Sequence, residues 1–489
     1  MAIQTSHLFE NFFHPSSIAI IGASTSERRG GESWVARFLE SGYSGKIYPV
    51  NPRADEILGL KAYPNLEDIP GSVDYAILNV PAKLTLQVLE DCIDKGVKIV
   101  HVFASGFEET GKEEGKKLQE ALSKKAKDGG VRLLGPNCFG IYYPSEGLTF
   151  QIKLPRKSGP VAFVSQSGAN CIRLVNMASL RGIHFSKVIS YGNAADLDAA
   201  DFLSYLEQDP ETEIICCYIE GVRDGRPLFD AARSCAQKKP LILLKAGLTQ
   251  GGSRAARFHT AADGGSYQVW DAFFKQTGAI EADSLEEMVD LLAAFLHLPT
   301  PRGRRVAVVG RGGGTGVLAA EICEREGLAI PSFSQHTLAE LERVIPRVGI
   351  CLNNPVEPPQ RSLASVKEFM GWGLELIEKD PQIDIIFVHL FLDIFGPNGS
   401  DLEPGLEEVV SKFTGLSTSL TKPVVIVLYP GERPDTANVV SRARERLFQA
   451  GVPVYPSFES AARAVSRYMR YRELFSQKGS LNGPSESER

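Results

Sequence analysis

The segment VAFVSQSGAN, residues 161–170, joins a short β-branched run to a turn of small residues and then to a helical pattern. A short apolar run bounded by glycine is typical of a buried strand. The start of the following helix offers unpaired backbone N–H groups and the positive end of the helix dipole, both of which favour anions. This strand–turn–helix unit recurs along the chain, so we predict parallel sheets with helices on both faces.

The repeated units fall into three blocks, separated by the polar breaks LPRKSGP at 154–160 and LPTPRGRR at 298–305. We therefore predict three doubly wound α/β domains, at 1–153, 154–300 and 301–475. The polar segment 476–489, SQKGSLNGPSESER, is predicted to be a disordered tail. The expected strands begin at Ser17, Lys46, Tyr75, Lys98 and Val131, at Val161, Ser186, Glu213 and Pro240, and at Val306, Asp384, Pro423 and Val452.

The composition excludes several classes of protein. With 489 residues, 43% hydrophobic and 23% charged, the chain can bury ample core, and its net charge of −6 argues against a nucleic-acid partner. The eight cysteines are scattered without a CxxC pair, so we expect reduced thiols in the cytoplasm, no disulfide framework and no metal site. No secretory leader and no membrane span are expected, because the N-terminal segment lacks a basic region before an apolar core and no apolar stretch approaches ~20 residues.

The first candidate ligand turn is GASTSERRGG, residues 22–31. It lacks the GxGxxG spacing of a dinucleotide site, and the next strand ends in PVNP without an acid to bind a ribose. The loop carries Arg28 and Arg29, which suit a ligand with several phosphates. A purely structural turn is an equally good interpretation of the spacing alone.

Two further turns, SQSG at 165–168 and GRGGGTG at 310–316, each follow an apolar strand and open a helix with small residues. Glycines in such turns let the backbone approach an anion, although no GK[ST] follows to make a P-loop. Either turn alone would more often be structural. Two of them together with a histidine in a segment of small residues favour a shared phosphate site.

That histidine is His259, in SRAARFHTAADGGS at 253–266, a segment that we predict to be a pliable loop. An imidazole can act as a nucleophile and carry a phosphoryl group, provided that a partner holds the proton on its other nitrogen. Glu220, which closes the strand IICCYI, is the candidate partner. The competing interpretation of Glu220 is a solvated strand end.

Together these segments resemble the α-type half of the NDP-forming acyl-CoA synthetases, the succinyl-CoA synthetase superfamily. IGAS, GKIYPVNP, VDYAILNVPAK, ASGFEETG and GPNCFG are similar to the CoA-binding domain of this family. VAFVSQSGA, ISYGNAADLD, YIEGVRDGRPL and KPLILLKAG resemble its second domain, and GRGGGTG with NNPVE its third. The resemblance spans roughly 18–474 and implies a Rossmann-like CoA-binding domain followed by two flavodoxin-like domains.

The resemblance also implies roles for individual residues. His259 would carry the phosphoryl group, Glu220 would orient it, and Asn137 would contact the acyl carbonyl. Cys138, beside Asn137, is better explained as a small buried hydrophobe. The residues expected at CoA are Gly22, Ser24, Val50, Asn51, Val80 and Pro81. Those expected at phosphate are Ser165, Gln166, Ser167, Gly168, Gly312, Gly313, Gly314, Thr315 and Gly316.

The implied enzyme is an ADP-forming acid–thiol ligase, which interconverts acyl-CoA, phosphate and ADP with carboxylic acid, CoA and ATP. No segment resembles the nucleotide-binding ATP-grasp domain of the family. We therefore expect a separate β-type subunit that holds Mg²⁺ with ATP or ADP, and hence a hetero-oligomer. Departures from the family pattern at Asp263, Arg311 and Glu357 leave an alternative, a diverged CoA-binding protein or an acyltransferase on the same scaffold.

Overall fold

The computed structural model describes residues 9–24, 33–260, 264–310, 312–345, 351–358, 363–390, 407, 410–415, 420–429 and 437–481. The chain divides into two compact units, Met1–Ser179 with His184–Leu285, and Leu180–Ile183 with Glu286–Arg489. Each unit is described by itself.

The first sheet of unit 1 is wholly parallel, with strand order β2-β1-β5-β6-β7. Every residue of β1, β5 and β6 is buried, which requires cover on both faces. Pro49 is tolerated in β2 because that strand lies at the sheet edge. The elements are β1 (Ser17–Ile21), α2 (Trp34–Ser41), β2 (Lys46–Val50), the small hairpin β3 (Glu56–Ile57) and β4 (Leu60–Lys61), β5 (Tyr75–Leu78), η1 (Ala82–Leu84), α3 (Thr85–Asp94), β6 (Ile99–Val102), η2 (Glu108–Thr110), α4 (Glu113–Asp128) and β7 (Arg132–Leu134).

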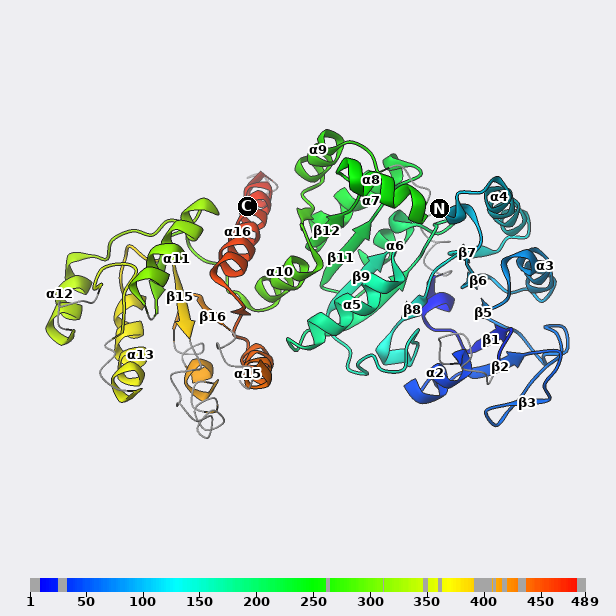
Figure 1. Ribbon diagram of the computed structural model, residues 1–489, viewed down its shortest axis with the longest axis horizontal. Coiled ribbons are helices and arrows are strands. Elements are labelled where there is room, and N and C mark those ends of the chain that lie inside the picture. Colours follow the sequence, from blue (N-terminus) through cyan, green and yellow to red (C-terminus); the bar gives the residue numbers. More distant parts are fainter. Residues whose placement is uncertain are drawn as a thin grey trace, which may run out of the picture. The chain divides into compact units, whose positions relative to one another are not determined.

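The second sheet of unit 1 has the order β13-β12-β11-β9-β10-β8. Its neighbouring strands β12, β11 and β9 are labelled side by side in Figure 1. Its strands run parallel except β8, which pairs antiparallel with β10. The elements are β8 (Gly140–Tyr142), η3 (Pro144–Glu146), β9 (Val161–Ser165), α5 (Gly168–Ser179), β10 (Phe185–Ser190), α6 (Ala199–Leu206), β11 (Ile214–Ile219), α7 (Gly225–Lys238), β12 (Leu241–Lys245), α8 (Gln250–Thr260), α9 (Tyr267–Thr277) and β13 (Ile280–Glu281).

Unit 2 contains a third parallel sheet, β14-β15-β16-β17. A continuous apolar core packs against it, from Ala307 on β14 to Val454 on β17. The elements are α10 (Leu285–His297), β14 (Val306–Val309), α11 (Gly313–Arg325), α12 (Gln335–Val344), α13 (Leu363–Glu378), β15 (Ile385–Leu390), β16 (Val424–Leu428), α15 (Ala437–Gln449), β17 (Val454–Tyr455) and α16 (Phe458–Leu481).

The α/β fold class is confirmed: two of the three sheets are wholly parallel, and the second is parallel except for β8. The predicted domain boundaries stay predictions, and three observations bear on them. Strand β8 lies within the predicted first domain but joins the second sheet. Helix α10 belongs with unit 2 because Phe295 packs on Tyr468 of α16, with ring centroids 5.0 Å apart, and Glu287 pairs with Arg467 at 3.0 Å. Helix α16 continues to Leu481, so 476–481 is helical backbone rather than the predicted disordered tail, and 482–489 lies outside the described residues.

Within the described part of the chain, every helix is too short or too polar to cross a bilayer.

Candidate active site

The residues predicted to contact CoA gather where β1, β2 and β5 end. Gly22 follows β1 with a φ of 81°, and a Cβ there would lie 2.4 Å from the carbonyl oxygen of Asn79. The Gly22 N–H donates to the Val50 carbonyl at 2.9 Å, and the Asn51 amide donates to the Ala23 carbonyl at 2.7 Å. Glycine is therefore required at this position for the strand ends to meet.

The other predicted CoA contacts lie around the same edge. The Val80 side chain comes within 3.0 Å of the position that a Cβ on Gly22 would take. Pro81 precedes η1, and Ser24 is an exposed residue just beyond Gly22. Arg28 and Arg29 lie outside the described residues. The structure thus brings Gly22, Val50, Asn51 and Val80 together at one sheet edge.

The SQSG turn is buried at the end of β9. The Ser165 hydroxyl donates to the Ser167 carbonyl at 2.9 Å and accepts from the Ser167 N–H at 3.1 Å, which holds the turn closed. Gly168 begins α5, where a Cβ would lie 2.5 Å from the ring of Phe139. The Gln166 side-chain oxygen accepts from two backbone N–H groups after β11. These two bonds fix which end of the amide is the oxygen, and the amide nitrogen at the other end is the group that can donate to an anion.

Glu220 is buried at the carboxyl end of β11, with 5% of its surface exposed. The interpretation of Glu220 as a solvated strand end is therefore wrong. Burial, followed by the charge of the nearby Glu220 carboxylate, raises the pKa of the Tyr218 hydroxyl. The Lys245 ammonium, also buried, donates to the Glu220 carbonyl at 2.8 Å. The acid predicted to orient an imidazole thus has a fixed position beside the SQSG turn.

The backbone at His259 is helical, so our prediction of a loop is wrong for this residue. His259 falls in the last turn of α8, and residues 261–263 lie outside the described part of the chain, Asp263 among them. Alanine and arginine are good helix formers, which explains a helix in a segment without an apolar stripe. Glycines with positive φ, Gly247 at 84° and Gly265 at 73°, lie on either side of α8. Contact between His259 and Glu220 stays a prediction.

Asn137 lies in the loop after β7 with a φ of 57°, a region that asparagine tolerates. Its amide donates to the side-chain oxygen of Asn193 at 3.4 Å. The neighbouring Cys138 is 4% exposed, and burial raises the pKa of its thiol far above the usual range. A buried protonated thiol agrees with a packing role for Cys138.

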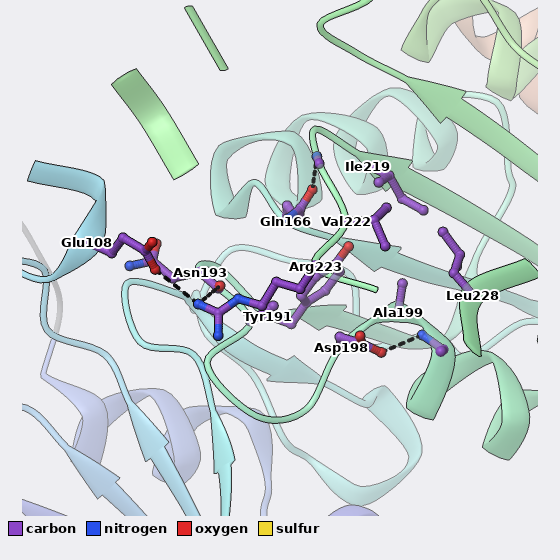
Figure 2. A pocket seen from close by; sticks show the side chains of 13 residues that line it. Glu108, Gln166, Tyr191, Asn193, Asp198, Ala199, Ile219, Val222, Arg223 and Leu228 are labelled. Atoms are coloured by element: carbon purple, nitrogen blue, oxygen red, sulfur yellow. Dashed lines mark hydrogen bonds and ion pairs between the residues drawn. The ribbon is translucent and has the colours of Figure 1, made fainter. Parts of the chain in front are cut away.

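A cavity of about 160 Å³ opens at the carboxyl edge of the second sheet. Figure 2 shows its polar mouth, where the Arg223 guanidinium lies beside Glu108 and Asn193, and its apolar wall at Ile219 and Leu228. Sequence reasoning missed Asn193, Tyr218 and Arg223. Asn193 and Arg223 each follow the end of an apolar strand, which is the position where ligand-binding residues collect.

In unit 2, the second predicted phosphate turn lies at the start of α11. Gly312 is the N-cap residue, with a φ of 96°, and α11 begins at Gly313. Glu357, from the segment NNPVE, is buried beside this turn, with its carboxylate oxygen 3.5 Å from the position of a Cβ on Gly313. Arg311 lies outside the described residues. A phosphate site shared between this turn and SQSG stays a prediction.

Comparison with known proteins agrees with this arrangement. Residues 16–144 match a CoA binding domain, and 158–295 match a succinyl-CoA ligase like flavodoxin domain. The alpha subunit of acetate–CoA ligase (ADP-forming) II from Pyrococcus furiosus is 37% identical over 97% of this chain and 100% of its own length. The chain belongs to the alpha-type subunits of the ADP-forming acyl-CoA synthetases. It is therefore a chain of an acid–thiol ligase with a CoA-binding domain.

The synthetase family also includes solved structures of the same fold. The dinucleotide-forming acetyl-coenzyme A synthetase 1 of Ca. Korarchaeum cryptofilum, solved with phosphate and ADP, superposes with a TM-score of 0.81 and 32% identity. The match covers 98% of this chain and 99% of that chain. The 4-hydroxybutyrate–CoA ligase (ADP-forming) of Nitrosopumilus maritimus is 31% identical over 94% of this chain and 64% of its own length. Relatives of this family are thus named for different acids.

Proposed function

We propose that this alpha chain converts an acyl-CoA and phosphate into free CoA and an acid through an acyl phosphate and a phosphohistidine at His259. A phosphate oxygen attacks the thioester carbonyl carbon, the C–S bond breaks, and CoA leaves as the thiol with a proton from phosphate. A ring nitrogen of His259 then attacks phosphorus, and the carboxylate leaves as the P–O bond breaks. Finally, ADP takes the phosphoryl group as the P–N bond breaks, which yields ATP.

The buried carboxylate of Glu220 is the observation that carries this proposal. It lies at the same edge of the second sheet as the SQSG turn, whose helix N-terminus favours an anion. A buried carboxylate requires a hydrogen-bond donor or a positive charge beside it. An imidazole that receives a phosphoryl group on one ring nitrogen requires a hydrogen-bond acceptor for the N–H on its other ring nitrogen. The 4% exposure and raised thiol pKa of Cys138 count against the alternative, an acyltransferase with a cysteine nucleophile.

The experiment that tests the proposal is a labelling assay with the full-length chain, acetyl-CoA and radiolabelled phosphate. We expect an acid-labile, base-stable phosphate on the protein, as phosphohistidine chemistry requires. Glu220→Gln should slow its formation by about 10²-fold or more, the range of a residue in acid–base catalysis. Wild-type kinetics in Glu220→Gln would contradict the role given to this carboxylate.

We propose acetate as the first acid to test, because four relatives that are 36–38% identical to this chain are named acetate–CoA ligases. Competition among acetyl-CoA, 4-hydroxybutyryl-CoA and feruloyl-CoA in the same labelling assay separates the substrate classes for which relatives are named. Faster labelling with an aryl or hydroxyacyl thioester would reject acetate.

We further propose that the first domain binds the adenosine diphosphate of CoA at Gly22, Ser24, Val50 and Asn51, with Val80 and Pro81 along the path toward the thiol. Asn51, rather than an acid, follows β2, which disfavours a ribose-binding site of the NAD type. Titration of the chain with CoA, dephospho-CoA and NAD tests this proposal. Tighter binding of NAD than of CoA would contradict it.

The nucleotide step is proposed to take place on a separate β-type ATP-grasp subunit that holds Mg²⁺ with ADP or ATP, so that the working enzyme is a hetero-oligomer. The relative from Pyrococcus furiosus carries the name of an alpha subunit, which supports this division. All eight cysteines are free thiols and seven are buried, which supports a reducing compartment such as the cytoplasm. Co-purification of the chain with an ATP-grasp protein, and ATP synthesis only by the mixture, is the expected result.

A further inference from the structure

We infer that Asn193 is a positioning residue, which holds the Asn137 carboxamide with its N–H end toward the acyl carbonyl, and that Glu109 sets the direction of this amide. The inference rests on the role proposed for Asn137. It adds a chain of hydrogen bonds that reaches the reacting carbonyl from the loop after β6.

The backbone around Asn193 is locked against the loop that carries Asn137. The Asn193 N–H donates to the Pro136 carbonyl at 3.0 Å, and the Ala195 N–H donates to the Gly135 carbonyl at 2.9 Å. Gly192 has a φ of 56°, and a Cβ there would lie 2.3 Å from the Pro136 oxygen. The Asn193 side chain therefore starts from a fixed position.

Both N–H groups of the Asn193 amide are used. They donate to the Glu109 carboxylate at 2.6 Å and to the Gln119 side-chain oxygen at 2.9 Å. The Asn193 side-chain oxygen accepts from the amide nitrogen of Asn137 at 3.4 Å. Asn193 is 4% exposed and Gln119 is 2% exposed, so water competes little for these bonds.

Two carboxylates determine which way these amides point. Glu109 offers only acceptors, one of which already takes the Gly106 N–H at 2.6 Å, so it must face the nitrogen of Asn193. Glu108 accepts from the amide nitrogen of Gln119 at 2.5 Å, which turns the Gln119 oxygen toward Asn193. A flipped Asn193 would bring its oxygen against two acceptors.

The consequence reaches Asn137. Because the Asn193 oxygen faces it, Asn137 must present its nitrogen there, and a flip would oppose two oxygens. One N–H of Asn137 is thus held by Asn193, and its second N–H is the donor that we assign to the thioester carbonyl. Arg223 from the end of β11 contacts both Glu108, at 3.1 Å, and the Asn193 carbonyl, at 3.4 Å, and so ties this group to the second sheet (Figure 2).

The test compares two routes to the same phosphoenzyme in the full-length chain. Acetyl-CoA with radiolabelled phosphate requires attack at the carbonyl, whereas radiolabelled acetyl phosphate delivers its phosphoryl group without that step.

Glu109→Gln supplies one acceptor where the carboxylate supplies two, so it cannot serve both Asn193 and the Gly106 N–H. We expect Glu109→Gln and Asn193→Asp to slow labelling from acetyl-CoA by about 10²-fold, the cost of a misplaced reacting group, with little change in the acetyl-CoA concentration for half-saturation. Labelling from acetyl phosphate should remain at the wild-type rate.

A double-mutant cycle distinguishes positioning from a general structural role. If Glu109 acts through Asn137, Glu109→Gln should add no further loss in an Asn137→Ala background. Equal slowing of both routes, independent losses in the double variant, or a wild-type rate in Glu109→Gln would each overturn the inference. A wild-type rate in Asn137→Ala would instead refute the proposed role of Asn137 itself.

Glu113→Gln is the matched control, because Glu113 lies on the nearby helix α4 with a largely exposed side chain. It should leave both routes unchanged. If Asn193→Asp does not fold, Glu109→Gln and the cycle with Asn137→Ala still decide the question.

Discussion

The Glu220 carboxylate, one residue beyond the end of β11, adds to burial in raising the pKa of the Tyr218 hydroxyl on that strand. The pair lies at the sheet edge where the SQSG turn also ends. We propose that this hydroxyl donates a hydrogen bond to Glu220 and so helps to orient the acid that would hold the imidazole of His259.

Tyr218→Phe should therefore slow phosphoenzyme formation by about 10-fold, the usual worth of a hydrogen bond to a charged group. The measurement is the rate of labelling from acetyl phosphate. Tyr267→Phe removes a hydroxyl from a side chain that is 58% exposed and should have no effect. Equal rates for the two variants would show that Tyr218 does not assist Glu220.

The contact between Gly168 and Phe139 predicts a specific effect of adding one methyl group. A Cβ on Gly168 would lie 2.5 Å from the Phe139 ring, so Gly168→Ala should displace the ring or the start of α5 and lower stability by about 1–3 kcal/mol. Gly225 is the matched control, because it also begins a helix and a Cβ there meets nothing within 4 Å. Chemical denaturation that finds the same stability for Gly168→Ala and Gly225→Ala would contradict the packing described here.

Much of this architecture follows from local patterns in the sequence. Apolar runs such as VAFVS at β9 and IICCYI at β11 predict the strands correctly, because parallel strands buried on both faces must be apolar throughout. Strand β8 could not be predicted in this way. It has only three residues, and its place depends on pairing with β10, which follows later in the chain.

The candidate site was harder to predict than the fold. The strand end identified Glu220, but its burial, at 5% exposure, depends on the packing of elements distant in sequence, which no local pattern shows. Asn193 gains one of its contacts from Glu109, which is distant in sequence and lies on η2, between β6 and β7 of the first sheet, so no local pattern reveals it. The helix at His259 was missed because α8 lacks an apolar stripe, although its residues favour helix.

The ion pairs of the buried Lys187 predict how the free energy of unfolding depends on pH. Its ammonium lies 2.9 Å from Asp209 and 2.6 Å from Glu211. Burial raises the pKa of Glu211, but hydrogen bonds from Lys187 and Tyr143 outweigh burial and hold this pKa below its usual value of 4.5. A carboxyl whose pKa is lower in the folded state than in the unfolded chain stabilises the fold at pH values above its unfolded-state pKa. This contribution is lost as the pH falls through the folded-state pKa.

Urea unfolding from pH 7 to about pH 3 should therefore show a smaller loss of stability on acidification in Glu211→Gln than in the wild type. Glu213→Gln, at an exposed position two residues away, should follow the wild type. The same acid dependence in all three proteins would mean that the folded state does not lower the pKa of Glu211.

The identity of the phosphorylated residue tests the central claim most directly. The full-length chain is incubated with acetyl-CoA and radiolabelled phosphate, and the label is located by peptide mapping in the wild type and in His259→Asn. We predict an acid-labile, base-stable phosphate on His259 in the wild type, and no label in His259→Asn, with CoA binding retained. A phosphohistidine that persists in His259→Asn, or a label that maps to another residue, would contradict the mechanism.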